Sequence, residues 1–348
     1  MISVIMPVYN SEKYLLAAVS SVLAAADGAL EIIAVDDCSK DSSFEILTSL
    51  ATKDPRVRPY RMEKNSGVAE VRNFALDKAR GEFLAFCDSD DTVPDGAYRA
   101  LLRAIGDKDI AVGGYRDITD SGSVTDAPVD KSARGNAFLT LFSVCCLWTK
   151  LIRRSFIEEN GIRFDSDMRI GEDVVFLARA AAAHPSVAFT ERTVYDHYYH
   201  DKDENASLTH VYTRRRFSEH LECRRRLLGI CAAAGISEAP RYVYELFSGD
   251  LDAYLLSIPD AAERADAFVE YMEFLSGYDW SGREETFRAI HGIYYSEMKA
   301  LSSDTFLSKI VGAKPRERLL SEFRTGKIGL RWVISYFKAW IEYKLSRD

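Results

Sequence analysis

Hydrophobic runs and amphipathic stretches alternate through residues 1–115. Short apolar runs predict strands at residues 3–8, 31–37, 57–62, 81–91 and 109–114. Between them, apolar positions at helical spacing predict helices at residues 12–26, 42–52, 67–79 and 95–105. Strands that alternate with helices in this way are typical of βαβ units. The pattern therefore predicts an α/β fold with a mostly parallel sheet.

The pattern changes beyond this region. Residues 116–135 are rich in Asp, Ser and Gly, and we expect a long surface loop there. Residues 137–199 return to mixed strand and helix patterns. After about residue 210 the spacing becomes almost wholly helical, at 213–234, 240–257, 261–276, 283–301 and 328–346. We therefore predict an α/β domain over residues 1–210 and a helical region over residues 211–348.

The 348 residues carry a net charge of −8, which argues against nucleic acid as a partner because nucleic-acid-binding domains usually carry a basic surplus. The charge is uneven, since residues 309–348 hold ten Lys and Arg against four Asp and Glu. The helix predicted over Ile328–Leu345 combines an apolar stripe with flanking aromatic and basic residues. That pattern suits peripheral contact with a membrane surface. Packing on the α/β domain, or on a second copy in a homo-oligomer, is the alternative.

The six cysteines include no CxxC pair, which favours a reduced protein with buried thiols. The chain opens directly into a strand pattern, without the basic and apolar segments of a signal peptide. The uncharged stretch at residues 136–149 is shorter than the about 20 residues that a membrane-spanning helix needs. We therefore expect a cytoplasmic protein, working at the inner face of the cell membrane.

Carboxylates follow two of the predicted strands. Asp36 and Asp37 end the second strand, and Asp88, Ser89 and Asp90 end the fourth. Ligands of open α/β sheets bind outside the carboxyl ends of the strands, so these side chains are expected at one edge. Alternate residues of an extended chain point to the same side, so Asp88 and Asp90 can offer oxygens to one Mn²⁺ or Mg²⁺ ion that grips a diphosphate. The alternative is that Asp ends strands because it favours turns.

Five segments resemble, in order, the motifs of the family 2 glycosyltransferases: MPVYN (6–10), VDDCSKDSS (35–43), NSGVAEVRNFAL (65–76), FCDSDDTVPDG (86–96) and RIGEDVVF (169–176). The resemblance covers residues 1 to about 200. It implies an inverting enzyme with the GT-A fold, of the kind common in bacterial polysaccharide assembly. The implied donor is a nucleotide sugar, a UDP-sugar by preference, and the implied acceptor is a glycan or a lipid-linked glycan.

The resemblance implies a role for each matching position at the donor nucleotide. Pro7 and Tyr9 would lie beside it, with the Tyr9 ring against the uracil, and Asp37 would accept the uracil N3–H. Arg72 corresponds to the helix residue that supports the nucleotide or the acidic cluster. Cys38 is a departure, because the family usually has Gly after the two Asp residues, and the shape of this turn is therefore open.

The resemblance also implies where a metal ion binds. Asp88-Ser89-Asp90 corresponds to the DxD motif of the family. Asp90 and its neighbour Asp91 would lie nearest the metal, which would be Mn²⁺ or Mg²⁺. Such an ion would stabilise the charge that builds up on the leaving diphosphate.

Asp173 matches the catalytic base of the family, in a Gly-Glu-Asp sequence that opens a helix. An acceptor hydroxyl is a poor nucleophile until a positioned carboxylate takes its proton, and Asp173 would do this. Glu172 is a candidate on the acceptor side and the next base to test. The alternative for both is that acidic residues are favoured in the first turn of a helix by its dipole.

Three further features are open to two readings. Trp148, in a Trp-x-Lys-Leu segment that resembles the family, would line the acceptor side, or it is a buried core residue. His200 stands where the family usually has Arg near the diphosphate, and His197 is a second candidate for that contact. Two arginine triplets, at residues 214–216 and 224–226, form either a solvated face or a site for an anionic acceptor.

The sequence thus predicts a metal-dependent, inverting transfer of a sugar from a UDP-sugar to a glycan hydroxyl. One rival is a nucleotidyltransferase that makes sugar nucleotides, but such an enzyme needs a Gly-rich phosphate loop after its first strand, where this chain has Pro7-Val8-Tyr9-Asn10. A second rival is a catalytically silent scaffold at the membrane surface. The intact Asp88, Asp90 and Asp173 argue against it.

Overall fold

The computed structural model describes residues 1–26, 28–133, 135–199 and 213–237, and seven single positions beyond them: Ala239, Ile258, Glu263, Ala267, Glu270, Tyr271 and Phe274. The chain divides into two compact units. Met1–Ala206 with Gly229–Ile236 form the first, and Ser207–Leu228 with Ser237–Asp348 form the second. Three predicted features lie outside the described residues. They are His200, the continuous helices at 240–257, 261–276, 283–301 and 328–346, and the candidate membrane helix Ile328–Leu345. The domain boundary near residue 210 therefore stays a prediction.

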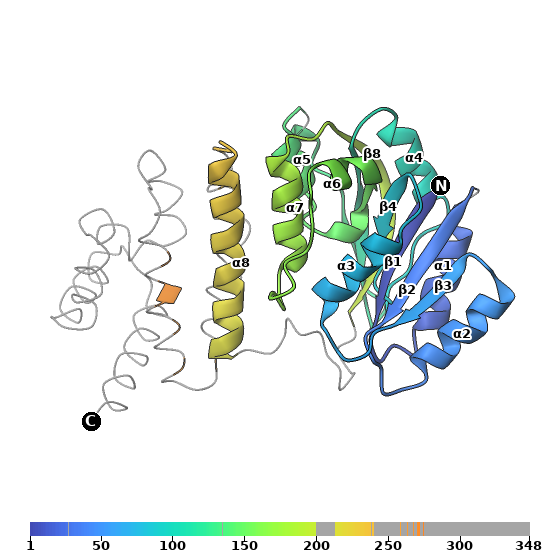
Figure 1. The fold of residues 1–348 in the computed structure, drawn as a ribbon. Helices are drawn as coiled ribbons and strands as arrows, with labels where there is room; N and C mark the ends of the chain where they lie inside the picture. Colours follow the sequence, from blue (N-terminus) through green and yellow to red (C-terminus); the bar gives the residue numbers. More distant parts are fainter. Residues whose placement is uncertain are drawn as a thin grey trace, which may run out of the picture. The chain divides into compact units, whose positions relative to one another are not determined.

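The first unit is built on one eight-stranded sheet (Figure 1). Its order is β3 (Val57–Arg61), β2 (Leu30–Asp36), β1 (Ile2–Val8), β4 (Phe83–Phe86), β7 (Lys150–Arg153), β5 (Ile110–Thr119) and β6 (Val124–Ala127), with β8 (Val187–Tyr199) paired to β5. The pairs β1–β2, β2–β3, β1–β4 and β5–β8 are parallel, whereas β7 and β6 run antiparallel to their neighbours. The predicted α/β fold with a mostly parallel sheet is confirmed.

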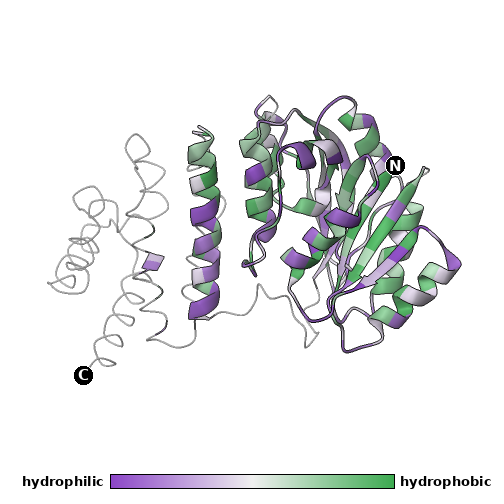
Figure 2. Ribbon diagram, in the orientation of Figure 1, coloured by the Kyte–Doolittle hydropathy of each residue, from purple (hydrophilic) through white to green (hydrophobic). Residues whose placement is uncertain are grey.

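Helices cover both faces of this sheet (Figure 1). On one face lie α1 (Leu15–Ala24), α2 (Ser43–Lys53) and α4 (Ala97–Ile105), and on the other lie α3 (Val68–Lys78), α6 (Arg154–Glu159) and α7 (Glu172–Ala182). Alternate residues of β1, such as Val4 and Met6, share one buried cluster with Leu15 and Val19 of α1. The central strands are hydrophobic along almost their whole length, as expected for strands that are buried on both faces (Figure 2).

The predicted long loop at residues 116–135 is wrong. Strand β5 continues to Thr119, and β6 pairs back on it as a hairpin whose turn is closed by the hydrogen bond from the Gly122 N–H to the Thr119 carbonyl (2.8 Å). Two short helices, Lys131–Ala133 and α5 (Ala137–Phe142), follow. The hydrophobic pattern did not predict the hairpin, because β6 lies at the edge of the sheet and is mostly exposed. Such a strand carries no row of apolar residues.

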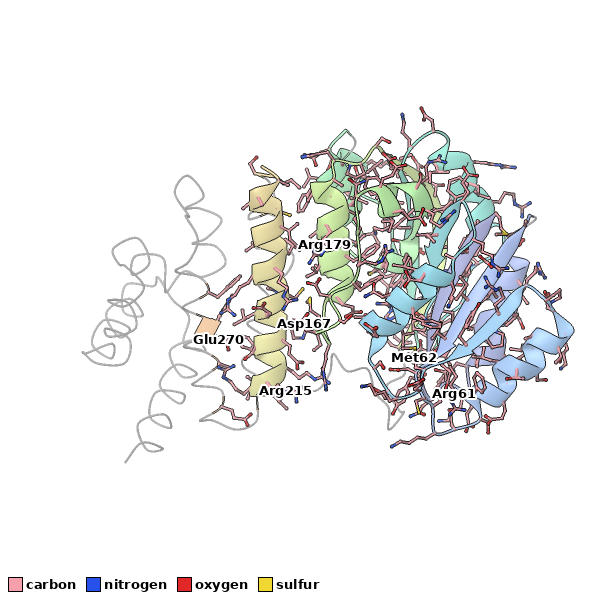
Figure 3. All side chains as sticks on the ribbon, viewed as in Figure 1. Arg61, Met62, Asp167, Arg179, Arg215 and Glu270 are labelled. Carbon is pink, nitrogen blue, oxygen red and sulfur yellow. The ribbon has the colours of Figure 1, made fainter. Side chains whose placement is uncertain are left out.

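The predicted helix at 213–234 is confirmed as α8 (Arg214–Ala233), whose residues up to Leu228 belong to the second unit. Arginines of both triplets form ion pairs. Arg214 and Arg225 reach Glu270, and Arg215 pairs with Glu219 at 3.1 Å (Figure 3 labels Arg215 and Glu270). These pairs favour the structural reading of the triplets over a site for an anionic acceptor. No helix within the described ranges has the length and apolarity that a membrane crossing requires.

Candidate active site

The carboxyl ends of β1, β2 and β4 meet at one edge of the sheet, because these three strands are parallel neighbours. The chain leaves them at Tyr9, Asp37 and Asp88, so the residues predicted from the strand ends come together. Two contacts tie the strand ends to one another. The Asp37 N–H donates to the Val8 carbonyl (2.8 Å), and the hydroxyl groups of Ser11 and Ser89 lie 2.7 Å apart.

The loop after β1 offers an aromatic ring to solvent. Tyr9 is 45% exposed, which is unusual for so large a ring beside a buried sheet and suits a face that a planar base can cover. Pro7 is half-buried inside β1, opposite Val35, so it lies just before the edge rather than on it. The predicted contact of Pro7 with a nucleotide is therefore less direct than that of Tyr9.

Asp37 is buried and its carboxylate is fixed. Its two oxygens accept the backbone N–H groups of Ser66 (2.7 Å) and Gly67 (2.8 Å), at the start of α3. A carboxylate oxygen has two lone pairs, so each oxygen keeps one for a further donor. The next residue, Cys38, has a φ of +61°, the left-handed region that glycine enters without cost. The turn that the glycine of the family would form is therefore kept here with a strained cysteine.

Arg72 of α3 is buried and links the two acidic parts of the site. Its guanidinium bonds the Asp88 carboxylate at 3.0 Å and the Glu172 carboxylate at 2.6 Å. Burial disfavours the charged form, but the nearby charges of Asp88, Glu172 and Asp173 outweigh it and raise the pKa of Arg72. Arg72 therefore stays cationic and holds the strand-end loop and the start of α7 together.

The acidic loop after β4, residues 88–91, places its carboxylates in different surroundings. Asp90 is exposed, and Asp88 is half-buried against Arg72. Asp91 is buried, and its two oxygens accept the Tyr195 hydroxyl and the Tyr198 N–H, each at 2.8 Å. Burial, helped by the neighbouring Asp90 and Asp88 charges, raises the pKa of Asp91. The predicted metal contact thus falls to Asp90, while Asp91 faces protein donors.

The donor chemistry of this loop fits a hard divalent ion. The described residues include no group of three or more His, Cys, Asp or Glu arranged to hold a metal. Mg²⁺ and Mn²⁺ are commonly bound through only one or two carboxylates, with phosphate oxygens of the substrate and water completing the shell. Asp90 with Asp88 would supply such a pair, so the residues fit an ion that arrives with a diphosphate.

Asp173 lies in the first turn of α7, after Gly171, which adopts a left-handed φ of 72°. Burial, together with the charge of Glu172, raises the pKa of Asp173 from 3.8 to about 6, although Arg72 opposes the shift. One oxygen accepts the Val174 N–H at 2.8 Å. A carboxylate that titrates near neutrality is ionised at pH 7 and is a better proton acceptor than an ordinary Asp.

Trp148 combines features of the two interpretations from the sequence, a core residue and a residue on the acceptor side. It is half-buried, packs against the core cluster, and stacks on the Tyr195 ring (centroids 4.2 Å apart, planes at 14°). The ring of His197 lies on it at 5.6 Å, and the His197 Nδ1 is 2.8 Å from Asp117. The structure therefore shows an aromatic group that extends from the core towards solvent, and an acceptor contact at Trp148 stays a prediction.

Two residues beside the site, Tyr195 and Lys150, are not among those that the sequence predicts. Tyr195 of β8 touches the acidic loop across 107 positions of sequence, and no local pattern signals such a contact. Lys150 is fully buried, and its ammonium donates to the carbonyls of Val144 and Cys146. Burial lowers the pKa of Lys150 to about 8. A signal for Lys150 was present, since a lysine inside the apolar run CLWTKLI is expected to be paired.

Residues 3–161 match the model of glycosyl transferase family 2. This part of the chain belongs to that family. EpsH of Bacillus subtilis strain 168, provisionally named a glycosyltransferase, is 30% identical to this chain over 231 residues, which are 63% of the chain and 66% of EpsH. The succinoglycan biosynthesis protein ExoO of Rhizobium meliloti strain 1021 is 31% identical over 195 residues, or 52% of the chain and 56% of ExoO.

The family 2 domain also has solved structural neighbours. The first 349 residues of TarS from S. aureus, crystallised with UDP-GlcNAc, superpose with a TM-score of 0.64 at 19% identity. The match covers 93% of this chain and 92% of that one. Identity at this level shows the GT-A-like fold alone. The chain spans less than two thirds of the length of EpsH and ExoO, so donor, acceptor and linkage do not follow from those relatives.

Proposed function

We propose that this chain transfers a sugar, with inversion, from a UDP-sugar to a hydroxyl of a glycan or lipid-linked glycan during surface-polysaccharide synthesis. The observation that carries the proposal is the single sheet edge that gathers Tyr9, Asp37 and Asp90, together with the link from Asp88 through Arg72 to the start of α7. TarS structures that contain UDP and UDP-GlcNAc support the donor class, and the name of ExoO supports the polysaccharide context.

The donor end would bind through groups that are already fixed. Asp37 cannot turn away, because backbone N–H groups hold both of its oxygens, and a free lone pair on it would accept the uracil N3–H. The exposed Tyr9 ring would cover the face of the base. Asp90 and Asp88 would hold Mn²⁺ or Mg²⁺ at the diphosphate. When bound, such an ion would neutralise charge on the leaving group.

The acceptor end would use Asp173 as the base. As the acceptor oxygen forms its bond to the anomeric carbon, its proton passes to the Asp173 carboxylate. The bond from the anomeric carbon to the diphosphate oxygen breaks on the opposite side, and its electron pair leaves with UDP. Attack and departure on opposite faces invert the configuration at this carbon. Arg72 would hold the donor end and the acceptor end in a fixed relative position, since it contacts both the acidic loop and Glu172.

The test uses the full chain, calorimetric titration with UDP in the presence and absence of Mn²⁺, and a transfer assay with a panel of UDP-, GDP- and dTDP-sugars. UDP should bind more tightly with Mn²⁺, and Asp90→Asn should remove most of that gain. Asp95→Asn is the matched control, because Asp95 lies just after the same loop with its side chain 86% exposed. A wild-type chain that does not bind UDP, or an Asp90→Asn variant that keeps the full Mn²⁺ effect, contradicts the proposal.

The same measurements separate the rival functions. A nucleotidyltransferase would release pyrophosphate from a nucleoside triphosphate, and a silent scaffold would bind without turnover. Our proposal requires UDP release that depends on an acceptor. We further propose that the chain works at the cytoplasmic face of the membrane, with Ile328–Leu345 as the contact. Truncation before Ile328 should then reduce co-sedimentation with anionic vesicles, and unchanged co-sedimentation would refute this role.

A further inference from the structure

A single hydroxyl holds both ends of the acidic loop. The Tyr195 hydroxyl accepts the backbone N–H of Asp88 (2.9 Å), where the loop begins, and donates to the Oδ2 of Asp91 (2.8 Å), where it ends. Tyr195 is fully buried, so water does not compete for these bonds. The exposed Asp90 lies between the two attached points. The Tyr195 hydroxyl therefore sets how far apart the ends of the loop stand, and with that the direction in which Asp90 points.

Strand β8 supports this hydroxyl with further bonds to the same segment. The N–H of Tyr198 donates to the other oxygen of Asp91 (2.8 Å). Thr92 and Asp196 form an isolated bridge, with backbone hydrogen bonds of 3.1 and 2.9 Å. The Asp196 carboxylate is itself held by two bonds from the Arg116 guanidinium, at 2.7 and 2.8 Å. The loop is thus bonded to β8, and β8 is in turn paired with β5.

The Tyr195 ring has no freedom to move the hydroxyl elsewhere. Its face stacks on Trp148, with ring planes at 14° and centroids 4.2 Å apart. The preceding residue, Val194, fills the space where Gly113 of β5 has no side chain, since a Cβ at Gly113 would lie 2.5 Å from Val194. Close packing on both sides fixes the path of β8 at this point. The hydroxyl is therefore presented to the loop by a rigid support.

We propose that Tyr195 is a positioning residue for the donor site. Its hydroxyl fixes residues 88–91 in the one arrangement that lets Asp88 and Asp90 face a nucleoside diphosphate and its divalent ion. The inference rests on the function proposed above and adds a residue that lies more than 100 positions further along the chain. Groups that position ligands need support of this kind, because a loss of about 1 Å in placement can cost about a hundredfold in rate.

The test is Tyr195→Phe in the full chain, which keeps the ring and its stacking on Trp148 and removes only the hydroxyl. Tyr98→Phe is the matched control, because Tyr98 is equally buried and its hydroxyl has no hydrogen-bond partner among the described residues. UDP affinity with Mn²⁺ should fall roughly tenfold or more in Tyr195→Phe and stay unchanged in Tyr98→Phe. Amide hydrogen exchange of residues 87–92 should accelerate in Tyr195→Phe without any ligand present.

Two further results distinguish positioning from a merely structural role. The donor KM should rise more than kcat falls, because the base at Asp173 is untouched. In an Asp90→Asn background, Tyr195→Phe should have no additional effect on Mn²⁺-dependent UDP binding, since both act through one loop. UDP affinity that is unchanged in Tyr195→Phe, or additive losses in the double variant, would overturn the inference. A wild-type chain that binds no UDP would instead overturn the proposed function, while the exchange measurement would still report on the loop.

Discussion

The replacement Asp173→Asn should make the protein more stable at neutral pH while it abolishes transfer. Asn keeps the size of the side chain and an oxygen that can accept the Val174 N–H. It cannot ionise, however, and the ionised form of Asp173 is disfavoured in the folded protein, where burial and Glu172 raise its pKa to about 6 from 3.8. Catalysis and stability should therefore move in opposite directions.

The magnitude follows from linkage. Because the folded-state pKa is the higher one, the stability contributed by protonated Asp173 is complete below about pH 4 and is lost as the pH rises through about 6. The rise of the pKa from 3.8 to about 6 corresponds to a stability loss of about 3 kcal/mol at pH 7.5 and of about half of that at pH 5. Asp173 keeps some exposure to solvent, so these values are upper limits.

The assay is urea unfolding of wild type and Asp173→Asn at pH 5 and pH 7.5, beside UDP calorimetry and the transfer assay. The variant should gain stability at pH 7.5, gain clearly less at pH 5, bind UDP as the wild type does, and transfer almost no sugar. Asp95→Asn should change stability by less than about 0.5 kcal/mol at either pH, because its side chain is 86% exposed. A variant that is less stable than wild type at pH 7.5, or one with high residual turnover, would refute the reasoning.

Three further replacements test the scaffold by urea unfolding. Arg72→Ala should cost about 3–5 kcal/mol, because it leaves the carboxylates of Asp88 and Glu172 without their cation, and a smaller loss would mean that water enters the site. Gly113→Ala should cost about 1–3 kcal/mol, since its Cβ would meet a stiff, buried valine at 2.5 Å. Cys38→Gly should add about 1 kcal/mol by relieving the φ of +61°, and a loss of stability would contradict the strain.

The sequence predicts those parts of the fold in which apolar residues follow the spacing of a strand or a helix. Strands β1, β2 and β4 are apolar runs, acidic residues end or follow β2 and β4, and parallel pairing then places the three strand ends at one edge. Helices α1 to α4 follow from their spacing, with ends that differ by only a few residues from those predicted. Tyr9, Asp37 and the acidic loop were candidates for the same reason, because they follow buried strands.

Other features depend on contacts that no local pattern contains. Strand β7 enters the sheet antiparallel, between β4 and β5, and its short sequence gives no sign of its direction. The ion pair of Arg72 with Glu172 joins residues 100 positions apart, so the sequence could suggest that Arg72 supports the site without showing how. Likewise, Asp90 and Asp91 look alike as adjacent acids in the sequence, and the contacts of Asp91 with Tyr195 and Tyr198 of β8 distinguish the buried one from the exposed one.

Strand β8 is the last strand of the sheet along the sequence, which matters when a shorter fragment of this protein is designed. The family match stops at residue 161, before Asp173 and before the whole of β8. A fragment with those limits would leave one long edge of β5 without its partner, and unpaired strand edges promote self-association. It would also lack the bonds from Tyr195 and Tyr198 of β8 that hold Asp88 and Asp91. The family match therefore ends before residues that complete the sheet and the candidate site. An expression fragment of the α/β part should extend beyond Tyr199.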